Sequence, residues 1–252
     1  MDHRPAGVFL KRTDFVQFFV RPAAVSDRYF YLENEEAHHA LRVLRKRVGE
    51  TLFAADGCGN LYEGRIESVE PMRVCVEILK HEVGVGEPRM RLTLAAAPPK
   101  GESFDWVVEK GTELGVAVFQ PLITQRTIIE PQSRLRRWRQ KALSAMKQCG
   151  RSVLPEVREP VPFAEFCLRL PNPAFIAHEE ADTPIHEFAA ALRRAEEAAV
   201  LIGPEGGFTD EEIETAVKGG AEVISLGPRR LRSETAALAA VIRLLAIAEE
   251  NG

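Results

Sequence analysis

Short hydrophobic segments dominate the first third of the chain. Each is rich in aromatic and β-branched residues and is bounded by turn residues, a pattern that predicts β-strands. The expected strands span residues 17–20, 29–32, 51–55, 61–66 and 72–79. A turn at Asp56–Asn60 predicts a hairpin between the third and fourth of them. A helix is expected over 35–47, where apolar residues share one face. Together these elements predict a small barrel-like or sandwich domain.

The pattern changes beyond a linker at Gly84–Pro88, where strands and helices begin to alternate. This rhythm predicts an α/β domain with a parallel sheet. Strands are expected at residues 91–97, 118–123, 174–177, 199–202 and 222–225. Helices are expected at residues 103–114, 133–148, 185–195, 210–218 and 234–249. Thr209–Glu212 is a capping box at the start of the fourth helix, and Gly219-Gly220 ends it.

The composition is that of a globular protein. Apolar residues make up 45% of the 252 residues, and 33 basic against 37 acidic residues give a formal net charge of −4. No run approaches the roughly 20 apolar residues of a bilayer helix, so no membrane partner is expected. The start of the chain carries charges and no long apolar stretch, unlike a secretory signal. Four widely spaced cysteines fit free thiols in a reducing cytosol, so we expect a cytoplasmic protein.

The segment Val200–Phe208 joins an apolar strand to a capped helix through a loop with three glycines and a proline. Gly203, Gly206 and Gly207 allow backbone N–H and C=O groups to approach a ligand, because no side chain stands between them. The Glu205 carboxylate can accept hydrogen bonds from a ribose or pair with a cation. Taken alone, this loop can also be read as a tight turn without a ligand.

A second loop, Ile224–Ala236, leaves a strand through Gly227-Pro228 in the same way and enters the last predicted helix. It carries three closely spaced arginines, and Ser233 is the expected N-cap of the helix. Loops at the carboxyl ends of neighbouring strands flank one crevice, so both loops are expected to line one site. Arginine there can bind phosphate or stabilise a developing oxyanion. A solvated basic turn is the alternative.

Other site types lack their motifs. The sequence contains neither G-x-x-x-x-G-K-[ST] nor a strand-to-helix G-x-G-x-x-G. This argues against a P-loop enzyme and an ordinary dinucleotide-binding dehydrogenase. No Cys-x-x-Cys or similar cluster occurs, so no metal site is expected.

Five stretches together resemble the motifs of one family. Ile202–Phe208 and Leu226–Ala236 look like the two C-terminal signature motifs of the RsmE family, the 16S rRNA uridine N3-methyltransferases. His39–Arg45 resembles the N-terminal RNA-binding motif of that family. Lys110–Gly115 and Gln148–Arg151 resemble motifs in the first half of its catalytic domain. The resemblance covers nearly the whole chain in the right order.

The resemblance implies a fold and an assembly. RsmE enzymes belong to the SPOUT class, so residues 89–252 are expected to form a parallel α/β sheet domain with a deep trefoil knot. Residues 17–84 are expected to form a PUA-like β-barrel that binds RNA. Residues 1–16 precede the usual start of the family and are expected to be disordered. SPOUT enzymes act as homodimers, and the implied partner is 16S rRNA or the small ribosomal subunit.

The resemblance also implies S-adenosylmethionine as cofactor, with metal in no role. The residues expected to hold it are His178, Gly203, Pro204, Glu205, Gly206, Gly207, Leu226, Gly227, Leu231 and Ser233. The stretch His178–Ala181 departs from the acidic or proline-containing stretch common in the family. Arg232 is the first choice for stabilising charge on the uridine oxygens, and Arg230 the second. Glu234 is the candidate general base, although acids at a helix start also simply favour the macrodipole.

RNA is expected to contact basic residues outside the two loops. Between residues 131 and 154 there are seven cations and no acid. Trp138 lies among them and is expected in the core rather than stacked on a base. The 17–84 segment has 9 basic and 11 acidic residues, so any RNA contact there must be a local stripe. The expected RNA-binding residues are Arg42, Arg45, Lys46, Lys110, Arg126, Arg134, Arg137 and Arg151.

Three functional hypotheses follow. The first is an RsmE-type methyltransferase, and the second is an enzyme of the same class that acts on another RNA or nucleoside. The third is a non-enzymatic RNA-binding or assembly protein that kept the fold. The glycines of both loops and Arg232 favour an enzyme, and the five motifs together favour the first hypothesis over the second.

Overall fold

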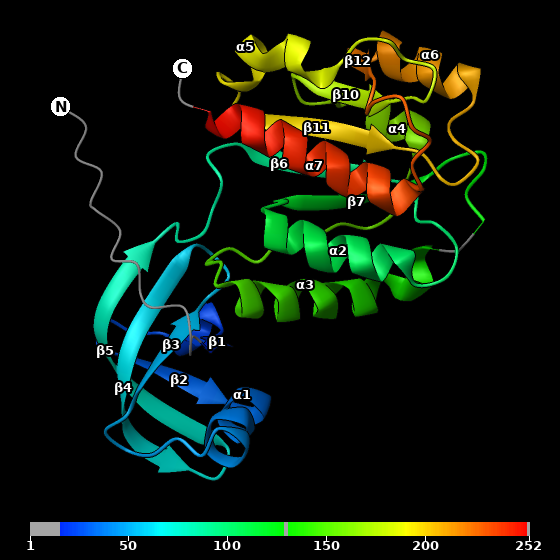
Figure 1. Ribbon diagram of the computed structural model, residues 1–252. Helices are drawn as coiled ribbons and strands as arrows, with labels where there is room; N and C mark the ends of the chain where they lie inside the picture. Colours follow the sequence, from blue (N-terminus) through cyan, green and yellow to red (C-terminus); the bar gives the residue numbers. More distant parts are fainter. Residues whose placement is uncertain (1–15, 129–130, 251–252) are drawn as a thin grey trace, which may run out of the picture. The chain divides into compact units, whose positions relative to one another are not determined.

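The computed structural model describes residues 16–128 and 131–250 (Figure 1). Its contacts divide the chain into two compact units, with the division between Val85 and Gly86. Each unit has a hydrophobic core of its own. The predicted disorder of residues 1–16 concerns a segment of which residues 1–15 lie outside the described residues.

The first unit is a strongly bent sheet with strand order β1-β3-β4-β5-β2. Its strands are β1 (Gln17–Phe19), β2 (Tyr29–Glu33), β3 (Thr51–Ala55), β4 (Asn60–Glu70) and β5 (Arg73–Val83). β1 runs parallel to β3, and the other neighbours are antiparallel. Phe30 and Leu32 of β2 point into the core and are fully buried, as the alternating pattern predicts. All the strands expected from the sequence are present, and β4 and β5 are longer than predicted.

The single long helix expected over residues 35–47 is wrong in its second half. The structure has a short α1 (Asn34–His38) followed by a π-helical turn, η3 (His39–Val43). The Arg45 backbone then takes a left-handed conformation with φ 55°. An L-residue in that conformation cannot continue a right-handed helix. The apolar pattern therefore extends beyond the helix itself.

The second unit is built on a parallel sheet with strand order β12-β10-β11-β6-β7-β8. Its strands are β6 (Arg91–Ala96), β7 (Val118–Ile123), β8 (Glu156–Val157), β10 (Ala174–Ala177), β11 (Glu197–Ile202) and β12 (Ala221–Ile224), and β9 (Val161–Pro162) pairs with β7. This confirms the predicted parallel α/β architecture. β8 and β9 were not predicted, because two residues carry no periodic signal.

Helices cover both faces of this sheet (Figure 1). They are α2 (Ser103–Leu114), α3 (Leu135–Cys149), α4 (Phe163–Cys167), α5 (Ala189–Leu192), α6 (Asp210–Lys218) and α7 (Ser233–Glu249). Short 3-10 turns η4 (Pro131–Arg134) and η5 (Ile185–Phe188) precede α3 and α5. The helix predicted at 185–195 is therefore η5 followed by one turn of α-helix. α4 was not predicted. None of the described helices is long and apolar enough to cross a membrane.

Alternation along β6 separates the two cores of this unit. Leu92 and Leu94 point into the core formed with α2, α3 and α7, whereas Ala95 points into the core formed with α4 and α6. Trp138 of α3 is fully buried against Phe104, with ring centroids 4.6 Å apart, so its predicted place in the core is confirmed. Its Nε1 donates a 3.0 Å hydrogen bond to Oδ1 of Asp105 and fixes α3 against α2.

Candidate functional site

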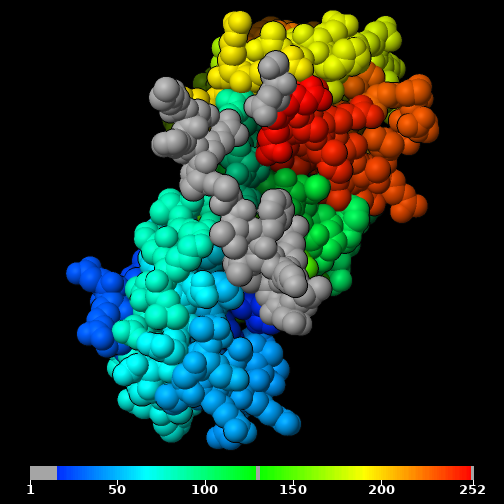
Figure 2. Space-filling view, turned by 60° about the vertical axis from the view of Figure 1, so that its left-hand side comes forward, coloured from blue at the N-terminus to red at the C-terminus, as the bar shows by residue number. Residues whose placement is uncertain are grey.

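A cavity of about 700 Å³ opens where the parallel strands end. The loops that follow β10, β11 and β12 supply most of its lining, and Ser103 and Arg126 complete it. Its size lies within the range of small-molecule sites, and its position at the carboxyl ends of the strands is where α/β sheets bind ligands. In Figure 2 the segment before α7 (orange) and α7 itself (red) form adjoining parts of the surface.

Both loops singled out in the sequence line this one cavity. So do all the residues expected to hold a cofactor: His178, Gly203, Pro204, Glu205, Gly206, Gly207, Leu226, Gly227, Leu231 and Ser233. The candidate catalytic residues Arg232, Arg230 and Glu234 lie in the same lining. The structure thus brings these residues together, and their individual roles stay predictions.

The backbone of the 203–208 loop needs its glycines for two different reasons. Gly207 has φ +71°, a left-handed conformation that side chains other than glycine rarely adopt. Gly203 is crowded instead, because a Cβ there would lie 3.1 Å from the Phe208 nitrogen. A side chain at Gly206 would lie 3.1 Å from Cδ of Arg126. The loop is therefore compact and presents backbone rather than side chains to the cavity.

Ser233 connects the two loops. Its Oγ donates a 2.7 Å hydrogen bond to the carbonyl oxygen of Gly203, and the residue is 8% exposed. The expectation that Ser233 is the N-cap of the last helix is wrong. The capping position belongs to Arg232, whose side chain makes no capping hydrogen bond, and Ser233 is the first helical residue. The Ser233 hydroxyl is turned to the neighbouring loop instead of to its own helix.

Side chains of two acids hold the 203–208 loop and the start of the helix that follows it. Oε1 of Glu205 accepts a 2.9 Å hydrogen bond from the Lys100 backbone N–H, so this carboxylate already has a partner in the loop after β6. Glu212 completes the predicted capping box, which is confirmed: it accepts from the Thr209 N–H at 2.9 Å while the Thr209 hydroxyl accepts from the Glu212 N–H at 3.3 Å.

The loop after β12 turns at Gly227, which has φ +103°. The Gly227 N–H donates a 3.2 Å hydrogen bond to Oγ of Ser225. Space around Gly227 is open, since a Cβ there would find only the Arg243 guanidinium, at 4.0 Å. The loop after β10 is held to the same strand, because the His178 N–H donates to the Ile224 carbonyl at 3.1 Å.

The arginines of the second loop differ in their partners. Nε of Arg230 lies 3.3 Å from Oε2 of Glu179, and both side chains are exposed. The structure gives the Arg232 side chain no hydrogen bond or ion pair with any described residue, and Arg232 is exposed at the cavity. Of the two candidates for charge stabilisation, Arg232 therefore has the guanidinium that is free to meet a substrate.

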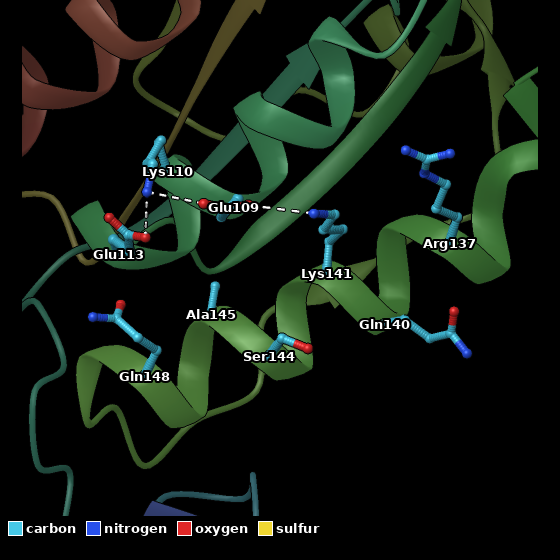
Figure 3. Close-up of a pocket in the computed structure, with 9 residues that line it drawn as sticks. All are labelled: Glu109, Lys110, Glu113, Arg137, Gln140, Lys141, Ser144, Ala145 and Gln148. Carbon is cyan, nitrogen blue, oxygen red and sulfur yellow. Dashed lines mark hydrogen bonds and ion pairs between the residues drawn. The ribbon is translucent and has the colours of Figure 1, made fainter. Parts of the chain in front are cut away.

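Most of the basic residues expected to bind RNA in the second unit are paired with acids. A groove of about 500 Å³ lies between α2 and α3, and the side chains that line it are drawn in Figure 3. Lys110 contacts Glu109 and Glu113 at 2.9 and 2.8 Å. Arg137 pairs with Glu102 and Asp105, and the Arg134 guanidinium donates to the Gly101 carbonyl. RNA would have to compete with these contacts.

Arg151, which is predicted to contact RNA, is buried and paired within the protein. The residue is 2% exposed. Its guanidinium lies 2.6 Å from Oε2 of Glu87 and donates to the carbonyls of Thr112 and Val116 at 2.9 and 2.8 Å. Glu87 also accepts from the backbone N–H groups of Ser152 and Val153. These contacts of Arg151 and Glu87 fix the start of the second unit to the ends of α2 and α3.

The basic stripe of the first unit has fewer partners. Arg42, Arg45 and Arg47 are exposed, and their side chains make no hydrogen bond or ion pair with the part of the chain that the structure describes. Lys46 is half-buried and donates from Nζ to the Thr51 carbonyl at 3.2 Å. The stripe begins within the π-helical turn, at Arg42, and includes the left-handed Arg45, so an irregular backbone presents these cations.

Comparison with known proteins places the chain in a family. Residues 86–245 match the family of RNA methyltransferase domains, and residues 32–79 match the RNA methyltransferase PUA domain. The chain is 32% identical to the ribosomal RNA small subunit methyltransferase E of Synechocystis over 91% of this chain and 77% of that protein. The chain belongs to the RsmE family of RNA methyltransferases.

Solved structures of the RsmE family have the same fold. The ribosomal RNA small subunit methyltransferase E of Neisseria gonorrhoeae, determined with bound S-adenosylmethionine, superposes with a TM-score of 0.84 at 29% identity and covers 93% of this chain and 98% of that one. A putative methyltransferase of Legionella pneumophila, also in complex with S-adenosylmethionine, gives 0.82 at 32% identity, with 92% and 98% covered.

Some residues of the RsmE-family cavity were not predicted from the sequence. Ser103 and Asp210 line it without having been named as site residues. Arg126, predicted as an RNA contact, lies in the lining of the same cavity. Its position directly after the buried strand β7 was the available signal, because a residue at the carboxyl end of a parallel strand points to the ligand edge.

Proposed function

We propose that this chain transfers a methyl group from S-adenosylmethionine to N3 of a uridine in the 16S rRNA of the small ribosomal subunit. The observation that carries the proposal is one cavity in which the two glycine loops meet through the Ser233–Gly203 hydrogen bond, with Arg232 beside it. The names of the RsmE relatives support the rRNA target, and the bound cofactor of two of their structures supports the methyl donor.

The cavity residues fit such a cofactor. Its volume of about 700 Å³ suits a nucleoside with an amino-acid tail. Gly207 and Gly227 leave open space where other residues would place a Cβ. Backbone groups of residues 203–207 and 226–231 can hold the adenine and the methionine tail. When bound, S-adenosylmethionine supplies an electrophilic methyl group on its sulfonium. Transfer of this methyl group needs no metal.

The protein must then make the uridine nucleophilic. N3 carries a proton and is hidden in a Watson–Crick pair, so the base has to be exposed before it reacts. As the proton leaves, negative charge spreads to O2 and O4. The Arg232 guanidinium is permanently charged, and a donor aimed at such a charge in a closed pocket is worth far more than in water. Arg230 is the second candidate for stabilising this charge, because its guanidinium is already paired with Glu179.

Glu234 is the proposed acceptor of the N3 proton. It stands in the first turn of α7, lines the cavity and is half-buried. A carboxylate at that position also interacts favourably with the helix macrodipole. Most of the rate enhancement is assigned to positioning of cofactor and base rather than to proton transfer.

The first unit is proposed to bind RNA through the basic stripe Arg42, Arg45, Lys46 and Arg47. Its unpaired arginines can contact phosphates without first breaking an ion pair. Lys110, Arg134 and Arg137 are a secondary surface, because their cations have partners within the protein.

We also propose a cytoplasmic homodimer with a knotted second unit, as in the SPOUT class. Trp106 of α2 and Ile242 of α7 are 45% and 51% exposed, on two helices that pack together. Exposed apolar side chains of this size favour burial against a second protein surface.

The test is the modification state of 16S rRNA. Cells that lack the protein should lose one N3-methyluridine, detected by mass spectrometry of the digested rRNA, and the purified chain should restore it. Loss of a different modified nucleotide would favour an enzyme of the same class with another target. Unchanged modification together with intact RNA binding would favour the non-enzymatic hypothesis.

A further inference from the structure

Arg126 follows β7 and reaches the 203–208 loop from the side. Its Nη1 donates to the Gly206 carbonyl and lies 3.4 Å from the Phe208 carbonyl oxygen. We infer that Arg126 is a positioning residue that holds the 203–208 loop in its ligand-binding shape, and that it contributes nothing to RNA affinity.

Three carbonyls of this loop accept hydrogen bonds from side chains elsewhere in the chain. The Gly203 carbonyl accepts from Ser233, and the Pro204 carbonyl accepts from the Gly207 N–H at 2.9 Å. The carbonyls of Gly206 and Phe208 both accept from Arg126. Backbone polar groups need a partner, and a glycine-rich loop without one samples many conformations. Arg126 therefore holds the half of the loop that Ser233 does not reach.

Arg126 is itself held by the helix that follows the loop. The backbone N–H of its neighbour Gln125 donates a 2.9 Å hydrogen bond to Oε1 of Glu212, and Glu212 is 6% exposed. The Thr124 N–H donates to Oγ1 of Thr127 at 2.8 Å and closes a turn around Arg126. Glu212 thus serves both the capping box of α6 and the segment that carries Arg126. These contacts connect α6 to the 124–127 turn through Glu212, and the turn to the 203–208 loop through Arg126.

The consequence for the reaction is specific. A loop held in its binding shape has less conformational entropy to lose when the ligand binds, so cofactor affinity is higher. Arg126 touches backbone carbonyls rather than reacting atoms, so its loss should weaken cofactor binding more than it lowers turnover at saturating cofactor. The effect on cofactor affinity rests on the proposed placement of S-adenosylmethionine in this cavity, whereas the effect on the loop does not.

The experiment compares Arg126→Ala and Arg126→Lys with Arg169→Ala, a matched control. Arg169 is exposed, has no side-chain partner among the described residues and lies outside the cavity lining. Amide hydrogen exchange of peptides covering 203–208 is measured without ligand. S-adenosylmethionine affinity is measured by calorimetry, RNA affinity over a salt series, and methylation by single-turnover kinetics.

Arg126→Ala should speed exchange in the 203–208 peptides and weaken S-adenosylmethionine binding on the order of 10-fold or more, because two hydrogen bonds from a charged donor are lost. Arg126→Lys should recover part of both effects, since an ammonium can replace one of the two bonds. RNA affinity and its salt slope should match Arg169→Ala, and the rate at saturating cofactor should fall less than the cofactor affinity.

Three results would overturn the inference. Unchanged loop exchange in Arg126→Ala would show that the loop does not need this side chain. A reduced RNA affinity and salt slope with normal loop exchange would make Arg126 a phosphate contact. A rate at saturating cofactor that falls more than the cofactor affinity would make it a catalytic residue. Faster loop exchange in a protein whose wild type does not bind S-adenosylmethionine would support the positioning role and refute only the proposed cofactor placement.

Discussion

The Ser233 hydroxyl donates its hydrogen bond to Gly203, thirty residues earlier in the chain, rather than to the backbone of its own helix. This single contact joins the start of α7 to the loop after β11. The parallel strands bring the two loops to one cavity, and this contact holds them to each other there.

Ser233→Ala should leave the Gly203 carbonyl without its partner. We expect the free energy of unfolding to fall by about 1 kcal/mol and cofactor affinity to fall about fivefold. Urea denaturation and calorimetry measure the two effects. Ser68→Ala, an exposed serine of β4, is the control and should change neither. Equal affinities for the two variants would show that the contact does not organise the site.

Gly227→Val should abolish cofactor binding, because the new side chain would enter the cavity. Gly227 and Gly220 have nearly the same left-handed backbone, with φ +103° and +97°, but only Gly227 lines the cavity. Gly220→Val is therefore a control for backbone strain. Both variants should lose about 1–2 kcal/mol of stability, measured by thermal unfolding, and only Gly227→Val should lose binding. Loss of binding in both would trace the effect to strain.

Arg232→Ala should lower the single-turnover methylation rate by about 10²–10³, the usual cost of one oxyanion donor. Folding and cofactor affinity should be largely kept, because the Arg232 side chain has no partner among the described residues. Arg232→Lys should recover little, since a point charge does not reproduce the planar guanidinium. A near-normal rate would move the role to Arg230 or Glu234, and a loss confined to RNA affinity would make Arg232 a phosphate anchor.

The basic stripe of the first unit can be tested by its salt dependence. Replacing Arg42, Arg45 and Arg47 by Gln should weaken RNA binding and reduce the log–log salt slope by about one unit per lost phosphate contact. The matched control replaces Arg21, Arg28 and Arg65, which pair with Glu33 or Glu77 in the same unit. Equal slopes for both triple variants would show that only net charge matters.

Arg151→Ala should destabilise the second unit strongly, because it leaves Glu87 without its buried partner. Breaking such a pair from one side costs about 3–5 kcal/mol. Arg158→Ala breaks an exposed pair with Glu156 at 3.0 Å and should cost about 0–1 kcal/mol. Denaturant unfolding compares the two. A stable Arg151→Ala with reduced RNA affinity would instead restore the RNA contact expected from the sequence.

Elements with a long, regular pattern could be predicted from the sequence, and irregular ones could not. The helices 103–114 and 210–218 match the prediction in full, and the capping box predicted for the second of them is present. Residues 39–47 carry a helical apolar pattern too, but they turn through η3 and a left-handed Arg45. Packing against the core of the first unit determines the path of this segment, and local periodicity does not predict such packing.

Local order along the chain determined which residues meet at the cavity. Parallel strands put their carboxyl ends on one edge, so two glycine loops after two strands had to face each other. Only the tertiary structure decided what the charged side chains do, at the cavity and elsewhere in the second unit. Arg151 and Arg126 look like surface cations in the sequence, yet one is buried on Glu87 and the other holds the Gly206 carbonyl. The partner of a cation is set by residues that the fold brings close to it. These residues lie far away in the sequence, so no local sequence pattern predicts them.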